Sequence, residues 1–243
     1  MNEKYIHTES LHNLRDPKHI IPEIIKIVNP KSVVDIGCGL GTFLYFFKEN
    51  GVSDVLGIDG PWTNKDMLSK YLNENEFMEK NLEEVFTLDK KYDLAISLEV
   101  AEHVSSESAD IFVKNLIAAG EIILFSAAIP LQGGQNHINE QWLSYWEEKF
   151  SENGYAIHDV IRPLIWNNSE MFWWYRQNMV LVTPNDYVLD ENLVKNPLRN
   201  IIHPKLFMLK SHSLEIMENG ELSPKIYLKL LLKSIRKKLS RWL

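Results

Sequence analysis

One segment of this sequence, VVDIGCGLGTF at residues 33–43, indicates the architecture more strongly than any other. Its apolar start predicts a buried strand, and the glycines at alternate positions, Gly37, Gly39 and Gly41, predict a tight turn before a helix. A turn with so few side chains lets a ligand approach the backbone closely, and the helix start behind it presents N–H groups. A dinucleotide-binding turn would need its third glycine at position 42, which is Thr42. The alternative is an ordinary strand-to-helix turn.

Strand-like and helix-like segments alternate around this turn. Apolar residues at helical spacing between positions 20 and 28 predict a helix that Pro30 stops. Because the later strands are separated by helices, the sequence predicts an α/β fold: a mostly parallel, seven-stranded sheet with helices on both faces. The predicted strands are 32–36, 54–59, 77–78, 92–98, 121–127, 155–160 and 177–183, and the predicted helices between them are 42–50, 64–73, 106–119 and 140–153.

The chain divides by composition into an N-terminal helical lead-in (1–30), the alternating domain (31–184) and a tail (185–243). The tail ends in residues 225–243, which carry seven basic and no acidic residues. Six of their apolar residues fall on one helical face: Leu228, Leu231, Leu232, Ile235, Leu239 and Trp242. A basic amphipathic helix suits an anionic membrane surface. It would equally suit packing on the protein's own core or on a partner subunit.

Overall composition narrows the function classes. The net charge of -7 gives no global electrostatic reason to bind nucleic acid. The single cysteine, Cys38, rules out an internal disulfide and is compatible with a reducing cytosol. Residues 1–10 lack the apolar core of a signal peptide, and no run approaches the ~20 apolar residues that span a bilayer. We therefore expect a cytoplasmic protein, with residues 225–243 as its predicted peripheral contact with the inner face of a membrane.

The alternating glycines preceded by Asp35 resemble motif I of the Rossmann-like (class I) methyltransferases that depend on S-adenosylmethionine (SAM). The resemblance continues through Asp59 and through residues 92–104, which are similar to motif IV, and so covers about residues 31–130. It implies that the turn lies under the methionine and ribose end of SAM and that Asp59 accepts hydrogen bonds from both ribose hydroxyls. The cofactor-binding residues that it implies are Asp35, Gly37, Cys38, Gly39, Gly41, Asp59, Trp62, Asn81, Leu82, Leu98 and Glu99.

Several of these residues have a structural alternative. Asp59 could instead cap a turn. Trp62 could cover one face of the adenine or pack on the surface. The amide oxygen of Asn81 could accept a bond from the adenine amino group, or it could serve the local turn. Cys38 fits the turn because it is small, and the sequence shows no neighbour that would activate its thiol as a nucleophile.

Glu99, Glu102 and His103 form the second notable cluster of residues. Their i, i+3, i+4 spacing predicts one shared helical face, and two carboxylates with an imidazole favour a divalent cation such as Mg²⁺ or Mn²⁺. The E-x-x-E-H pattern is similar to that of the small-RNA 2′-O-methyltransferases and the ubiquinone-pathway O-methyltransferases. In the first group a histidine from a later loop completes the site, and His137 is its counterpart here. Without a metal, Glu99 would contact SAM, and His137 or His103 would be the candidate general base.

The cluster favours a hydroxyl acceptor. An alcohol is nearly as weak an acid as water, so it needs a cation or a base, whereas a carbon or sulfur acceptor does not. Residues 125–130, 133–142 and 173–178 resemble a methyltransferase subgroup associated with bacterial surface-glycan gene sets, which implies a small-molecule or lipid-linked saccharide as acceptor. A polyprenyl phenol, an RNA 2′-hydroxyl, and a SAM-binding regulatory protein without catalysis remain alternatives. Aromatic residues of the second half could meet a sugar, and the polar residues there, Arg162, Arg176 and Gln177, could engage a phosphate or a sugar hydroxyl.

Overall fold

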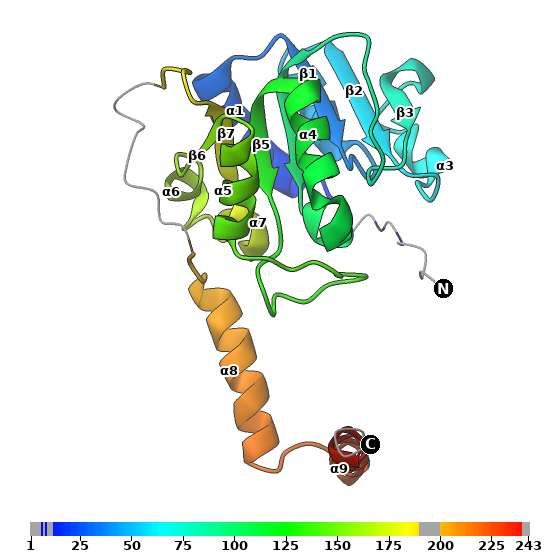
Figure 1. The fold of residues 1–243 in the computed structure, drawn as a ribbon, viewed down its shortest axis with the longest axis vertical. Coiled ribbons are helices and arrows are strands. Elements are labelled where there is room, and N and C mark those ends of the chain that lie inside the picture. The colour runs from blue at the N-terminus through cyan, green and yellow to red at the C-terminus, as the bar shows by residue number, and fades with distance from the viewer. Residues whose placement is uncertain (1–5, 7, 9–11, 190–199, 240–243) are drawn as a thin grey trace. The chain divides into compact units, whose positions relative to one another are not determined.

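The structure is a computed structural model that describes residues 6, 8, 12–189 and 200–239. The chain separates into two compact units, residues 1–201 and 202–243 (Figure 1). The division falls inside the predicted tail, and the helix of the predicted lead-in contributes to the core of the first unit. Each unit is considered by itself.

The first unit is built on one seven-stranded sheet with the order β3-β2-β1-β4-β5-β7-β6. The first five strands in that order pair in parallel, and β7 runs antiparallel to both of its neighbours. The predicted fold class is therefore confirmed, with β7 as the antiparallel exception. The strands are β1 (Ser32–Ile36), β2 (Asp54–Asp59), β3 (Phe77–Glu79), β4 (Tyr92–Leu98), β5 (Gly120–Ser126), β6 (Tyr155–His158) and β7 (Val180–Pro184).

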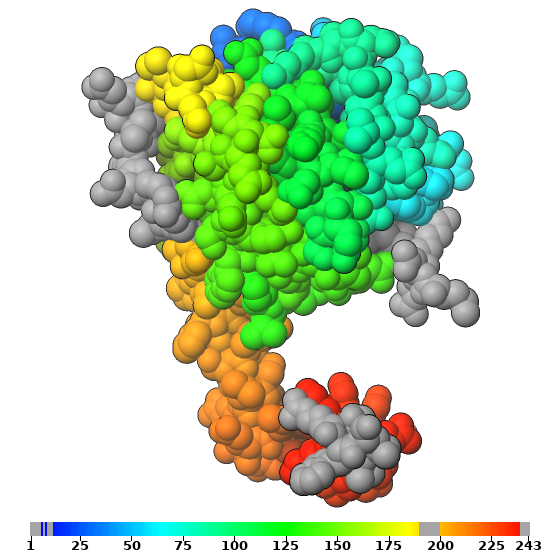
Figure 2. Space-filling model, viewed as in Figure 1, coloured from blue at the N-terminus to red at the C-terminus, as the bar shows by residue number. Residues whose placement is uncertain are grey.

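Helices cover both faces of this sheet, because successive strand residues point to opposite sides. Leu94 and Ile96 of β4 belong to a core with α1, α2 and α6, whereas Ala95 belongs to a second core with α4 and α5. In Figures 1 and 2, α4 and α5 lie over the face nearer the viewer, and their side chains form a continuous surface. The helices of this unit are α1 (Arg15–Val28), α2 (Thr42–Glu49), α3 (Lys65–Leu68), α4 (Ala109–Ala119), α5 (Leu143–Glu152), α6 (Arg162–Ile165) and α7 (Trp173–Asn178), with short 3-10 turns η1 (Glu74–Glu76), η2 (Ala101–His103) and η3 (Ser106–Ser108).

Two predicted elements differ from the structure. The helix predicted over 64–73 is limited to α3, Lys65–Leu68. The last strand begins at Val180 and not at position 177, because Trp173–Asn178 forms α7. Gln177 and Asn178 therefore end a helix. Both are buried, and the amide of Asn178 bonds to Glu99, 79 residues earlier in the chain. That long-range contact has no counterpart in the local sequence pattern.

The glycine turn joins β1 to α2 as the sequence predicts. Gly37, Gly39 and Gly41 all have positive φ angles, of 88°, 55° and 78°. A Cβ added at Gly37 would lie 2.4 Å from a methyl of Val100, so the approach of the next chain segment also requires glycine there. The N–H groups of Gly37 and Cys38 both donate to the carbonyl of Ile58, which ties the turn to the end of β2.

The second unit consists of two helices, α8 (Pro204–Glu218) and α9 (Pro224–Leu239). α9 accounts for the helix predicted within 225–243. Residues 240–243, which include Arg241 and Trp242, lie outside the described residues. In the described parts of the chain, every helix is too short or too polar to cross a membrane.

Candidate active site

A cavity of about 1310 Å³ lies at the carboxyl ends of β1, β2 and β4. Open α/β sheets bind their ligands at this edge. The predicted cofactor-binding, metal-binding and catalytic residues all line the cavity except Gly41, which is the N-cap of α2 instead. The glycine turn and the His137 loop therefore bound one continuous space.

At the cofactor end, the carboxylate of Asp59 is held by the backbone. Its Oδ2 accepts from the N–H of Gly39 at 2.7 Å, and its Oδ1 accepts from the N–H of Gly60 at 2.6 Å. Burial raises the pKa of Asp59 to about 6, although these bonds and one from the Trp62 side chain oppose the shift.

Trp62 lies at the edge of the cavity with 37% of its surface exposed. Its ring packs on the backbone of Gly60, where an added Cβ would lie 2.3 Å from the ring. The ring therefore packs locally and also lines the cavity, and its contact with the adenine stays a prediction.

Two buried groups behind the glycine turn have raised pKa values. Burial raises the pKa of Asp35 well above its ordinary value, and the charge of Asp59 adds to the shift. Burial and the same two acids raise the pKa of the Cys38 thiol. A thiol so disfavoured as thiolate is a poor nucleophile, which agrees with a packing role for Cys38 against Gly57.

Asn81 has a structural role in addition to its place in the lining. Its side-chain N–H donates to Glu84 at 2.8 Å, and its oxygen accepts from the N–H of Glu83 at 3.1 Å. The apolar side chains of Leu82 and Leu98 are buried in the lining. They offer the hydrophobic wall that a flat base needs.

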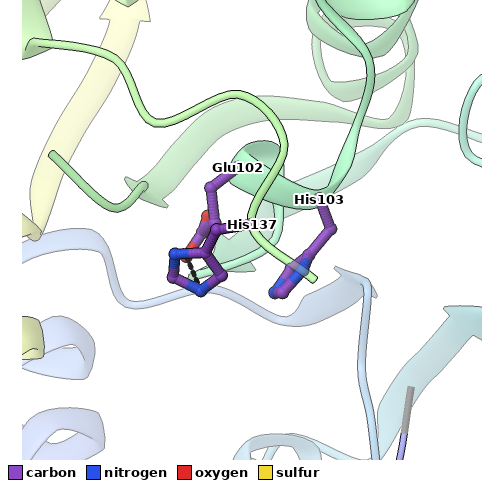
Figure 3. Close-up of side chains that lie close together, drawn as sticks. All are labelled: Glu102, His103 and His137. Atoms are coloured by element: carbon purple, nitrogen blue, oxygen red, sulfur yellow. Dashed lines mark ion pairs between the residues drawn. The ribbon is translucent and has the colours of Figure 1, made fainter. Parts of the chain in front are cut away.

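The far end of the cavity holds Glu102, His103 and His137 (Figure 3). Each offers a ligand atom, and these atoms lie within 4.8 Å of one another. Glu102 and His103 come from η2, and His137 comes from the loop after β5. That loop is pinned to η2, because the N–H groups of Ile138 and Asn139 donate to the main-chain carbonyl of Glu102 at 2.9 and 3.0 Å.

The Glu102 side chain is fully buried, and neither of its carboxylate oxygens has a hydrogen-bond partner. The Nε2 of His137 lies 3.9 Å from Oε1, a charge contact longer than a hydrogen bond. Burial, and then the charge of Glu99, raises the pKa of Glu102 well above its ordinary value. Backbone groups of Glu102 and Ala128 oppose the shift without reaching hydrogen-bond geometry. A charged carboxylate that is buried without hydrogen-bond partners is destabilised, and a bound proton or cation would remove this destabilisation.

In each of the two imidazoles, a hydrogen-bond acceptor beside Nδ1 determines which ring nitrogen carries the proton. His137 Nδ1 lies 2.9 Å from a carboxylate oxygen of Glu140, and His103 Nδ1 lies 3.3 Å from the carbonyl of Asn136. Both partners only accept, so Nδ1 carries the proton and Nε2 the lone pair. Burial and the neighbouring His137 lower the pKa of His103 to about 4, so that it is neutral at pH 7.

Glu99 does not join this cluster, contrary to the predicted metal set. The prediction assumed a helical face, but Glu99 has a φ of 57° and precedes η2, so its side chain leaves in another direction. Its carboxylate accepts from Gln132 at 2.7 Å and from Asn178 at 3.0 and 3.3 Å. This amide clamp holds Glu99 in the cavity wall between the glycine turn and the cluster.

Sequence reasoning missed Gln132 and Glu140 and placed Asn178 on a strand. Gln132 precedes the Gly133-Gly134 pair, and Glu140 stands three residues after His137. The spacing of three residues between His137 and Glu140 is the sequence signal that could identify Glu140 as the partner of this histidine.

The polar residues expected to engage a phosphate or a sugar serve the scaffold. Arg162 is buried, and it pairs with Asp159 at 2.7 Å and donates to the carbonyl of Gln177. Arg176 donates to the carbonyl of Trp166. None of the three predicted residues, Arg162, Arg176 and Gln177, lines the cavity.

Aromatic side chains form one wall of the cavity. Trp173, Trp174 and Tyr175 of α7 line it, together with His12 and Asn13 from the segment before α1. In contrast, Trp146 is buried in the core. The start of α7 is tied to α1, because Asp16 accepts from the N–H of Phe172 at 2.7 Å.

Comparison with known proteins agrees with this geometry. Residues 10–214 match a family profile described as a methyltransferase domain. The chain belongs to this methyltransferase family. The predicted resemblance to class I methyltransferases is thereby confirmed at the level of the family, whereas the likeness to the glycan-associated subgroup stays a prediction.

Curated relatives of this methyltransferase include two ubiquinone biosynthesis O-methyltransferases. The mitochondrial one of Dictyostelium discoideum is 29% identical over 129 residues, which are 47% of this chain and 37% of that protein. The one of Rickettsia felis is 34% identical over 107 residues, 41% of this chain and 42% of that protein. The chain thus spans about two fifths of their length. Among solved structures, the small RNA methyltransferase HEN1 aligns with a TM-score of 0.52 and 16% identity, over 71% of this chain and 25% of that one, a likeness of fold.

Proposed function

We propose that this methyltransferase transfers the methyl group of SAM to a hydroxyl oxygen, and that the acceptor is a saccharide of cell-surface glycan biosynthesis, free or lipid-linked. One observation carries the proposal. The buried Glu102 carboxylate, without a hydrogen-bond partner, shares a cavity with Asp59, the residue assigned to the SAM ribose. A methyl donor at one end and a group that can activate a hydroxyl at the other are what O-methylation requires.

Methyl transfer from SAM is an in-line displacement at carbon. The acceptor oxygen forms the new C–O bond as the C–S bond breaks, and S-adenosylhomocysteine leaves. The sulfonium is already a strong electrophile, so the protein must align the acceptor, a contribution on the order of 7–11 kcal/mol in good cases. It must also receive the hydroxyl proton.

His137 is the better candidate to receive that proton. Its Nε2 faces the cavity with a lone pair, and Glu140 on Nδ1 would stabilise the imidazolium that forms. His103, with its pKa lowered to about 4, binds a proton weakly at neutral pH. Its neutral imidazole can orient the acceptor or ligate a cation.

The same residues fit a divalent cation. Glu102, His103 and His137 would hold it, because the buried carboxylate lacks a partner and both imidazoles have Nδ1 acceptors that leave Nε2 unprotonated. A set with two imidazoles suits Mn²⁺ better than Mg²⁺. When bound, the cation would polarise the acceptor oxygen and lower the pKa of its hydroxyl. His137 would then be a ligand, and the base would lie elsewhere.

The aromatic wall supports a saccharide acceptor. Flat faces such as those of Trp173 and Trp174 suit the C–H faces of a sugar ring, and both residues line the cavity. A polyprenyl phenol is the second candidate, favoured by relatives whose names place them in ubiquinone biosynthesis. The net charge of -7 argues against an RNA acceptor.

An assay with methyl-labelled SAM tests the proposal on fractionated cell-envelope glycans and lipids, with chelator and with added Mn²⁺. Label in an alkali-stable methyl ether of a sugar is the expected result. Label on a phenolic lipid alone would overturn the saccharide acceptor and favour the second candidate. Tight SAM binding without transfer to any fraction would favour the non-catalytic alternative. The matched control is the Glu102→Gln variant, which should show no response to Mn²⁺.

A further inference from the structure

α9 presents an apolar stripe that no described residue of its own unit covers. Leu228, Leu231, Leu232 and Ile235 are 57%, 57%, 50% and 45% exposed. Their spacing of three, one and three residues places them on one side of the helix. At a rise of about 1.5 Å per residue, the stripe from Leu228 to Ile235 extends over about 10 Å, or two turns, in the middle of the helix.

Basic side chains border this stripe. The described residues of α9 include six Lys or Arg and no Asp or Glu, and the six are Lys225, Lys229, Lys233, Arg236, Lys237 and Lys238. The rest of the chain has 20 basic against 33 acidic residues. The positive charge of α9 is therefore a local feature of an otherwise acidic protein. Lys229, Lys233 and Arg236 follow one another along the flank next to the stripe.

The preceding helix offers a contrast within the same unit. α8 also exposes large apolar residues, including Phe207, Met208, Leu209 and Leu214, but their positions are spread around the helix and form no single stripe. Its last turns carry Glu215 and Glu218. The turn between the helices is fixed, because the hydroxyl of Tyr227 donates to the carbonyl of Met217 at 2.7 Å. Of these two helices, α9 alone combines positive charge with an apolar stripe.

We propose that α9 binds an anionic lipid surface, lying in the plane of the membrane with its stripe at the boundary between headgroups and acyl chains. The lysine stems then extend along the apolar face while their ammonium groups meet lipid phosphates. No described helix can span the bilayer, so the contact is peripheral.

Two other occupants explain the surface less well. A nucleic acid would neutralise the basic flank but leave the leucines in water. A second copy that covers the stripe with its own α9 would bring two sets of six positive charges together. A lipid surface meets both features at once. The inference is independent of the proposed acceptor, since it concerns residues outside the cavity.

Sedimentation of the full-length protein with vesicles tests the inference. We compare vesicles of pure phosphatidylcholine with vesicles that contain phosphatidylglycerol as a minor component. Binding to the anionic vesicles, and its loss at high salt, is the expected result. Equal binding to both kinds, or binding to neither, would overturn the inference.

Two variants and one control locate the contact. Leu231→Glu removes the centre of the stripe, and the double change Lys229→Glu with Lys233→Glu reverses two flanking charges. Each should weaken binding to anionic vesicles at least about tenfold. The control is Phe207→Glu, an equally drastic change at an exposed residue of α8 that should leave binding within about twofold. Thermal unfolding and SAM affinity should stay unchanged in all three, so a folding defect is distinguishable.

Three outcomes would refute the lipid contact. Sedimentation equilibrium could reveal a dimer that Leu231→Glu dissociates, with no vesicle binding, which would assign the stripe to a second copy. Binding to single-stranded oligonucleotides that competes with vesicles and survives Leu231→Glu would assign the flank to nucleic acid. If Phe207→Glu weakened vesicle binding as much as Leu231→Glu, α9 would not be the contact.

Discussion

The buried carboxylates at the two ends of the cavity differ in their hydrogen bonding. At the cofactor end, both oxygens of Asp59 accept a backbone N–H. At the cluster end, neither oxygen of Glu102 has a hydrogen-bond partner. An unpartnered buried polar group costs about 1–3 kcal/mol, and more if it is charged. The fold therefore completes the first site by itself and leaves the second to be completed by a proton, a cation or an acceptor.

Removal of His137 should have the largest effect on this comparison. We expect His137→Ala to lower turnover about 10²- to 10⁴-fold, because the acceptor loses either its base or its activating ligand. SAM affinity, which depends on the other end, should change by less than about twofold. Glu140→Gln is the graded control, since it keeps the His137 side chain but weakens the partner of its Nδ1. Single-turnover rates and calorimetry with SAM measure the two quantities, and retained turnover would remove His137 from the site.

The Glu102→Gln variant tests whether a cation binds to the carboxylate at the cluster end of the cavity. Because burial disfavours the charged form of Glu102 and raises its pKa, the neutral, isosteric amide should leave the melting temperature of the cation-free protein nearly unchanged. Added Mn²⁺ should raise the melting temperature of the wild type but not of the variant. Thermal unfolding with and without Mn²⁺ decides the matter. An equal rise in both proteins would show that the cation binds elsewhere.

Substitution of Asp59 tests the cofactor end of the cavity. In Asp59→Asn one carboxylate oxygen becomes an NH₂ group that must face a backbone N–H, so we expect SAM affinity to fall about 10- to 100-fold. The wild type should also bind SAM more weakly as the pH falls through about 6, by up to about tenfold per unit, because protonation removes the charge that the ribose hydroxyls meet. Calorimetry over a pH series measures both effects, and the variant should lack this pH dependence.

The raised pKa of Asp59 has the opposite effect on the ligand-free protein. The folded state holds a proton up to about pH 6, whereas the unfolded aspartate releases it near its ordinary value of 3.8. The contribution of this group to stability is therefore fully present below about pH 4 and is lost as the pH rises through about 6. If the free energy of unfolding of the wild type rose between about pH 4 and about pH 6, and that of Asp59→Asn did not, the raised pKa of Asp59 would be contradicted.

The smallest effect is expected between the two ends, at the amide clamp on Glu99. Asn178→Ala removes one of its two amide donors, and we expect SAM affinity to fall about five- to tenfold while the Mn²⁺ response stays. Asn50→Ala is a matched control, because Asn50 is an exposed asparagine that bonds only to its own helix. If Asn178→Ala abolished the Mn²⁺ response instead, Glu99 would belong to the cation site after all.

Much of the fold follows from local patterns. The glycine turn, the parallel strands up to β5 and the covering helices are each specified by a period of two or of 3.6 and by residues that only certain turns tolerate. The same logic locates the functional residues at the carboxyl edge of the sheet. It fails at the end of α7, where the sequence predicts the start of the strand 177–183 but the buried amides of Gln177 and Asn178 bond to Gln132 and Glu99, far along the chain.

What the residue order alone settles is therefore the α/β architecture, the glycine turn and the chemical types gathered at the cavity, because these depend on near neighbours. What only tertiary structure decides is which of those groups converge. Glu99 and Glu102 are three residues apart, yet one is clamped by Gln132 and Asn178 and the other is left without a partner. The partners of Glu99 come from distant segments, and a left-handed backbone at Glu99 turns the two carboxylates apart, so spacing along the chain could not separate their roles.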